Sequence, residues 1–134
     1  KLANLFNQYR IFYGEKTDLK AATDFLKSRF KNEDSVILIA HKNSQMGGFI
    51  QLYPSFSSVG MQKIWILNDL FVDTDFRRQN VARNLMEAAK KHAKETGALR
   101  IDLATQTSNS NAQNLYGSMG YIKNEVFWHY SLEL

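Results

Sequence analysis

The sequence of 134 residues has no cysteine and only one proline, Pro54. Without cysteine the chain can form no disulfide, no thiolate metal ligand and no cysteine nucleophile, and the absence fits an intracellular compartment. No apolar run approaches the roughly 20 residues that cross a bilayer, and no basic-then-apolar signal segment opens the chain. These absences predict a soluble, cytoplasmic protein with no membrane partner.

The composition is that of a folded domain. Apolar residues make up 44% of the chain and aromatic residues 13%, enough to bury a substantial core at this length. The 17 lysines and arginines exceed the 13 acids by four charges; this excess suits an anionic ligand but is too small to argue for nucleic acid. Because no repeat, linker or low-complexity segment occurs, we expect residues 1–134 to form a single domain.

Hydrophobic periodicity predicts both helices and strands. Helices are predicted over 2–12, from 17 or 18 to 30, over 81–97 and over 112–119; strands are predicted over 35–41, 46–53, 61–72, 99–105, 121–122 and 126–134. The second strand is expected to end at Pro54, and the long third strand has room for a bulge. Short turns make the first three strands antiparallel, and the strand–helix–strand unit over 61–105 makes a parallel crossover. The fold class is therefore α+β, with a mixed sheet flanked by helices.

A polar turn with two adjacent arginines, Arg77 and Arg78, separates the long strand from the helix that follows it. A helix N-terminus offers unpaired N–H groups and the positive end of a dipole, and Arg83 adds charge beside it. The turn is thus a candidate anion site, or alternatively an ordinary connection with solvated arginines. A Walker-type loop is excluded because Gly-Lys-Ser/Thr is absent, and a dinucleotide fingerprint because the turn has no glycine.

The turn and its surroundings resemble the GNAT acetyltransferases. Arg77-x-x-Asn80-x-Ala82 is similar to the family's Gln/Arg-x-x-Gly-x-Gly/Ala loop, whose amides hold the pyrophosphate of acetyl-CoA. The preceding Asp69-Leu70-Phe71-Val72 resembles the family's strand 4, and Asn109-x-x-Ala112-x-x-Leu115-Tyr116 with Gly120-Tyr121 resembles its second cofactor motif. The resemblance covers about half the chain, residues 61–121. It implies a GNAT fold, with a splay between the parallel strands 4 and 5.

By this resemblance acetyl-CoA is the co-substrate. A backbone N–H near Phe71 would polarise the thioester oxygen, and Asn109 would contact the pantetheine arm or order the loop. An N-cap role for Asn109 is compatible with both. The residues expected to bind the cofactor are Leu70, Phe71, Val72, Arg77, Arg78, Gln79, Asn80, Val81, Ala82, Arg83, Asn109, Ala112 and Tyr116.

The sequence departs from the family pattern at two places. Asn80 stands where the family usually has glycine, and asparagine tolerates a positive φ at small cost. The family fold also begins with a strand before its first helix, and this strand is missing here. We therefore expect about 10 to 15 residues, enough for a strand and its turn, to precede Lys1.

Asp69 is the candidate residue for activating the acceptor amine. Amines titrate near pH ~10, so a base or a water chain must take a proton at neutral pH. Asp69 is the only acid between Ile64 and Val72, and it resembles an acidic position in polyamine and protein acetyltransferases. Asn68 stands where some of these relatives have a glutamate base. We expect Asp69 to act directly, to act through water or to orient the amine; the alternative is a buried aspartate that only holds a loop or helix.

Tyr116 matches the family's tyrosine beside the cofactor sulfur. The resemblance predicts that it gives a proton to the departing thiolate. It also shares a helical stripe with Leu115 and Met119, so a packing role is the alternative.

The predicted function is direct transfer of acetyl from acetyl-CoA to a primary amine in a ternary complex. The acceptor class stays open among polyamines, other small amines, and a protein lysine or N-terminus. A non-catalytic acyl-CoA sensor or regulatory module is the alternative. No histidine spacing suggests a metal site, and the aromatic-rich end over 127–130 suits either a homodimer interface or a monomer core. Aromatics near Pro54 line an acceptor pocket or belong to the core: Tyr53, Phe56 and Trp65.

Overall fold

The computed structural model describes residues 1–134, and the chain divides into two units, Lys1–Ala104 and Thr105–Leu134. The first unit holds a four-stranded sheet and three α-helices, and the second holds one α-helix followed by an irregular tail. None of the helices has both the length and the apolar character that crossing a membrane requires.

Two helices, α1 (Leu2–Phe12) and α2 (Leu19–Asn32), open the first unit. Of the two residues at which the sequence lets α2 begin, Thr17 and Asp18, it is Asp18 that caps the helix: its carboxylate accepts a hydrogen bond from the amide of Ala21 at 3.0 Å. The two helices bury one aromatic and aliphatic core against the sheet. Its buried members are Leu5, Phe6, Ala22, Leu26, Phe49 and Phe71.

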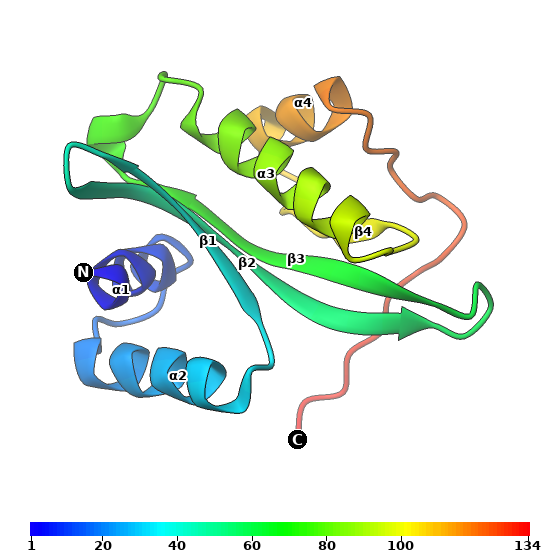
Figure 1. Cartoon of the computed structure of the whole chain (residues 1–134), viewed down its shortest axis with the longest axis horizontal. Coiled ribbons are helices and arrows are strands. Elements are labelled where there is room, and N and C mark those ends of the chain that lie inside the picture. The colour runs from blue at the N-terminus through cyan, green and yellow to red at the C-terminus, as the bar shows by residue number, and fades with distance from the viewer. The chain divides into compact units, whose positions relative to one another are not determined.

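The sheet consists of β1 (Val36–Lys42), β2 (Gln45–Ser57), β3 (Gln62–Val72) and β4 (Ile101–Leu103), paired in that order. The first three strands are antiparallel, and β3 pairs with β4 in parallel across helix α3 (Val81–Glu95). Helices α1 and α2 cover one face of this sheet, and α3 covers the other (Figure 1). The mixed sheet predicted from the sequence is therefore confirmed.

The prediction that the second strand ends at Pro54 is wrong, because β2 continues to Ser57. Strand β1 pairs with β2 only as far as Leu52. Beyond that residue β2 has an open edge, where the missing N–H of proline removes no ladder hydrogen bond.

Strand β4 has three residues, fewer than the predicted strand over 99–105, although its backbone contacts with β3 begin earlier. The amide of Leu99 bonds the Lys63 carbonyl at 2.8 Å, and the amide of Trp65 bonds the Arg100 carbonyl at 3.1 Å. The parallel register ends where Leu67 pairs with Leu103. From that point β3 runs on to Val72 with no β4 partner, so the two strands part as the GNAT resemblance implies.

The second unit contains α4 (Ser110–Ser118), which begins at its N-cap Asn109. The strands predicted over 121–122 and 126–134 are wrong: no strand follows α4. An alternating pattern forms a strand only when a neighbouring strand completes its hydrogen bonds. This tail has no such neighbour, and its apolar side chains are exposed, Ile122 by 92% and Trp128 by 84%.

Candidate active site

The arginine turn begins where β3 ends. A short 3-10 helix, η1 (Thr74–Phe76), follows. It begins at its N-cap Asp73, whose carboxylate accepts a hydrogen bond from the amide of Asp75 at 3.2 Å. Two residues of the turn that follows, Arg78 and Asn80, adopt left-handed backbone angles, each with φ of 62°. The chain thereby reverses direction within four residues and enters α3.

The N-terminus of α3 lacks a side-chain cap. Asn80 occupies the N-cap position, but its side chain makes no capping hydrogen bond. The first amides of an α-helix have no acceptor inside the helix, so the N–H groups of Val81 and Ala82 point out of it at the positive end of the dipole. This geometry suits an anion such as a phosphate.

Side chains of the turn fix its backbone to the strand. Arg77 donates from Nε to the carbonyl of Val72 at 3.2 Å, and Gln79 donates from Nε2 to the carbonyl of Asp75 at 3.2 Å. The start of α3 also lies close against β2. A Cβ added at Gly48 would lie 2.8 Å from the Phe71 carbonyl oxygen and 3.3 Å from Val81 Cγ1. The first unit therefore holds the predicted cofactor residues from Leu70 to Arg83 along the end of β3, the turn and the first residues of α3.

We expect Asn80→Val to lower the free energy of unfolding by about 1–2 kcal/mol, because a β-branched residue is strained at positive φ. Asn80→Gly should be neutral or stabilising. Asn84→Val, the same change at an exposed position inside α3, is the matched control and should change the stability little. Urea unfolding measures all three; equal effects of the two valine variants would contradict the argument.

Strand β3 contains the bulge that the sequence allows. Gln51 of β2 pairs with Asp69, but the next residue, Leu52, pairs with Leu67, so Asn68 is an extra residue with no partner across the strand. The bulge brings neighbouring side chains together that would otherwise point to opposite faces. Asn68 donates from Nδ2 to Oδ1 of Asp69 at 2.9 Å.

Asp69 is a buried carboxylate, only 3% exposed. Its second oxygen, Oδ2, accepts a hydrogen bond from Nε2 of Gln51 at 2.5 Å. Gln51 is itself completely buried, and its Oε1 accepts from the hydroxyl of Ser35 at 3.0 Å. This chain of polar side chains was not predicted, although Gln51 is the one polar residue in the run Phe49-Ile50-Gln51-Leu52.

Two tyrosines lie near Asp69. Burial raises the pKa of Tyr9 on α1, and the charge of Asp69 and a hydrogen bond to its carboxylate raise it further. The Tyr9 hydroxyl also donates to the carbonyl of Asn68 at 3.4 Å. Burial is the larger cause, and the charge of Asp69 the smaller, of the raised pKa of Tyr53, which is about 12. Both phenols therefore keep their protons at neutral pH and act as donors; Tyr9 was not predicted.

The other aromatic residues near Pro54 have separate locations. Trp65 is buried, its ring lies 5.0 Å from that of His92 on α3, and its Nε1 donates to Thr96 at 2.9 Å. Phe56 is 76% exposed. Trp65 is thus a core residue.

The edge of β3 that faces away from β2 is open beyond Leu67. Asp73 donates its amide to the carbonyl of Gly47 on β2 at 2.8 Å. Because hydrogen bonds alternate along an antiparallel strand, the amide of Phe71 also faces β2. The amides of Leu70 and Val72 face the open edge instead, where β4 has ended.

The remaining predicted site residues lie in the second unit. The side chain of Asn109 accepts from the amide of Ala112 at 3.2 Å, so its N-cap role is present. Tyr116 lies on α4, and its ring centroid is 6.1 Å from that of Tyr121. These residues form a local arrangement of their own, and their contacts with cofactor stay a prediction.

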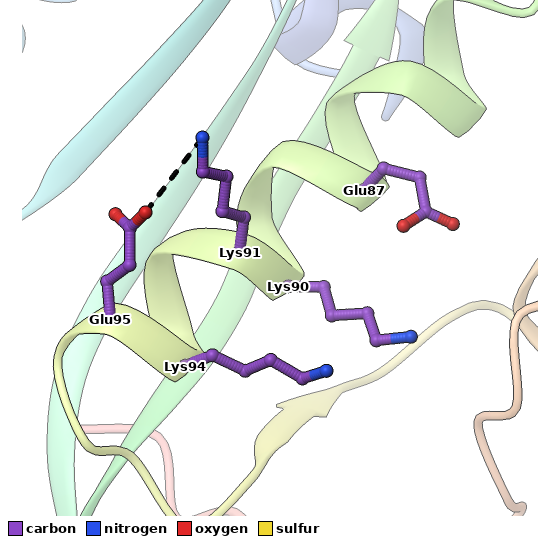
Figure 2. Close-up of a pocket in the computed structure, with 5 residues that line it drawn as sticks. All are labelled: Glu87, Lys90, Lys91, Lys94 and Glu95. Carbon is purple, nitrogen blue, oxygen red and sulfur yellow. Dashed lines mark ion pairs between the residues drawn. The ribbon is translucent and has the colours of Figure 1, made fainter.

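The outer face of α3 carries exposed charges of both signs. Figure 2 shows Glu87, Lys90, Lys91, Lys94 and Glu95 around a shallow hollow on this face. Lys91 and Glu95 are 3.9 Å apart and mostly exposed, so this pair adds little stability. The chain contains no cluster of three or more histidine, aspartate or glutamate side chains that could hold a metal ion.

Comparisons with known proteins agree on one family. The model of the acetyltransferase (GNAT) family matches residues 2–121, which span both units. An uncharacterized N-acetyltransferase of Bacillus subtilis (strain 168), YhfO, is 47% identical over 99% of this chain and 89% of its own. A probable acetyltransferase of Haemophilus influenzae is 31% identical over 77% of this chain and 73% of its own. The crystal structure of a probable acetyltransferase, 41% identical, superposes with a TM-score of 0.93 over 99% of this chain and 89% of that one.

Proposed function

Because the chain belongs to the GNAT family of acetyltransferases, we propose that it transfers the acetyl group of acetyl-CoA directly to a primary amine in a ternary complex. Acetyl transfer to amines is general for this family. The acceptor is a polyamine, another small amine, or a protein lysine or N-terminus, and residues 1–134 work as one acetyltransferase domain. A homodimer and a cytoplasmic location stay predictions from the sequence.

One observation carries the proposal. The bulged strand that holds the buried Asp69 runs directly, through the open edge of Leu70 and Val72, into the left-handed turn before α3. A carboxylate for the amine, backbone donors for a thioester and a turn for a phosphate thus follow one another along a single segment. Acetyl transfer from CoA to an amine is favoured when these three groups are held close together.

The turn residues would bind the pyrophosphate of acetyl-CoA. The amides of Val81 and Ala82 provide hydrogen-bond donors, and Arg77, Arg78 and Arg83 provide positive charge. Gln79 and Asn80 shape the turn that holds these groups in place. Arg78 and Asn80 both adopt a positive φ in this turn, so Asn80 takes the backbone conformation for which the family uses glycine.

The open edge of β3 would hold the acyl end of the cofactor. We assign the polarising donor to the amide of Leu70 or Val72, the neighbours of Phe71, because the amide of Phe71 faces β2. A fixed backbone N–H stabilises the oxyanion that develops on the thioester carbonyl. Asn109 and Ala112, at the start of α4, would order the second cofactor motif.

Asp69 and Tyr116 would move the protons. Asp69 attracts the cationic acceptor and either receives its proton, directly or through water, or orients it. Tyr116 gives a proton to the thiolate of CoA as it departs. With no cysteine in the chain, acetyl cannot pass through a cysteinyl intermediate, so transfer is direct.

The test is CoA release over a panel of amines. The chain is incubated with acetyl-CoA and spermidine, an aminoglycoside, free lysine or a lysine peptide, and free thiol is measured. Because the protein has no thiol of its own, a thiol-reactive dye detects the released CoA alone. We expect release that depends on at least one amine. A protein that acetyl-CoA stabilises against heat but that releases no thiol with any amine would be a sensor instead.

A further inference from the structure

Gln51 is an unusual residue for the centre of a sheet. It is completely buried on β2, with Ile37 of β1 on one side and Asp69 of β3 on the other. A buried amide destabilises the fold unless its hydrogen bonds are made. The side chain meets this condition at both ends, through Ser35 and Asp69.

Chemistry fixes the direction of this chain of hydrogen bonds. The amide nitrogen of Gln51 donates to Oδ2 of Asp69, because of the two ends of the amide only the nitrogen is a donor. The amide oxygen then faces Ser35, whose hydroxyl donates to it at 3.0 Å. Ser35 therefore holds Gln51 in one orientation, and Gln51 holds Oδ2 of Asp69.

Other donors compete for the same carboxylate. Tyr9 is one of them: burial raises the pKa of its phenol, and the charge of Asp69 and a hydrogen bond to the Asp69 carboxylate raise that pKa further. The terminal torsion of an aspartate is soft. If Gln51 did not hold Oδ2, the carboxylate could turn toward the Tyr9 hydroxyl and away from Asn68.

We propose that Gln51, anchored by Ser35, is a positioning residue that fixes the carboxylate of Asp69 for the acceptor amine. With Oδ2 held from β2, Oδ1 stays beside Asn68. The inference rests on the proposed function, because it requires that Asp69 serves the amine. Under this inference a residue of β2 takes part in the reaction. The other residues proposed for it come from β3, the turn and α4.

The experiment compares Gln51→Met with Ile50→Met. Methionine fills a similar volume without a donor, and Ile50 is equally buried on the same strand but faces the opposite side of the sheet. We expect Gln51→Met to lower kcat by about 10- to 100-fold, as misplaced groups do, with KM for acetyl-CoA unchanged. Ile50→Met should keep kcat within about 3-fold. Ser35→Ala removes the anchor without altering the core and should lower kcat in the same direction.

A double-mutant cycle with Asp69→Asn separates positioning from stability. If Gln51 acts only through Asp69, the double variant is no slower than Asp69→Asn alone. Additive losses, or full activity of both Gln51→Met and Ser35→Ala, would overturn the inference while leaving the acetyltransferase proposal intact. A wild-type chain that acetylates no amine would instead overturn the proposed function.

Discussion

Replacement of Tyr116 by phenylalanine is expected to lower kcat by about 10²- to 10⁴-fold, the range that general acid catalysis supplies. The change removes one hydroxyl and keeps the ring, so the packing of α4 should be preserved. A thiol titrates near ~8.5 and a tyrosine near ~10, so the phenol is protonated at neutral pH and can supply the proton that the departing thiolate takes.

The binding of acetyl-CoA should survive this substitution. Thermal shift or calorimetric titration with acetyl-CoA measures the affinity, and thiol release measures kcat on the same preparation. Tyr130→Phe is the control, because Tyr130 is 87% exposed and has no assigned role in the reaction. Its kcat should stay within about 2-fold of the wild-type value, since the hydroxyl that it removes takes no part in the proposed proton transfer.

An unchanged kcat in Tyr116→Phe would mean that water, and not Tyr116, gives the proton to the departing thiolate. Tyr116 would then be a packing residue on the stripe with Leu115 and Met119, the alternative that the sequence leaves open. A loss of acetyl-CoA affinity equal to the loss of kcat would instead indicate that the hydroxyl binds the cofactor in its ground state.

The sequence predicts most of the first unit because its signals are local. Asp18 caps α2, and a polar turn separates β3 from α3; each of these depends on a few neighbouring residues. The same holds for Asn80, whose left-handed backbone follows from the tolerance of asparagine for positive φ. The GNAT resemblance adds the family, which the comparisons confirm.

The missed features depend on partners that are distant in sequence. Gln51 and Asp69 are 18 residues apart, and Tyr9 reaches the Asn68 carbonyl across 59 residues. A periodic pattern places a residue on a face but does not name its neighbour on the next strand. The extension of β2 past Pro54 has the same origin, because it depends on where β1 stops pairing.

Asp69→Asn is the second change with a large expected effect, a loss of about 10²-fold or more in kcat, which is the lower end of acid–base contributions. Asparagine has the same shape but cannot take a proton or attract an ammonium group by charge. It also meets two amide donors, from Gln51 and Asn68, with one oxygen instead of two. One donor is left unpaired, so the free energy of unfolding should fall by about 1–3 kcal/mol.

The loss of charge should also be visible without any substrate. The charge of Asp69 contributes to the raised pKa of Tyr53, about 12, so Asp69→Asn should lower the pKa of Tyr53 toward the ordinary tyrosine value. Magnetic resonance of labelled tyrosines measures this titration. Asp102→Asn is the matched control: Asp102 lies on β4 in an exposed pair with Arg100 at 2.9 Å, and its removal should affect neither kcat nor Tyr53.

The profile of kcat/KM against pH separates the two roles left to Asp69. If the carboxylate accepts the amine proton, Asp69→Asn removes the rise in rate with pH that the base produces and leaves only the titration of the free amine. If Asp69 orients the amine by charge, KM for the amine rises and the shape of the profile stays. Should kcat, KM and the profile all match the wild type, Asp69 would be a structural residue that holds β2 to the bulge of β3, and the base would have to lie elsewhere.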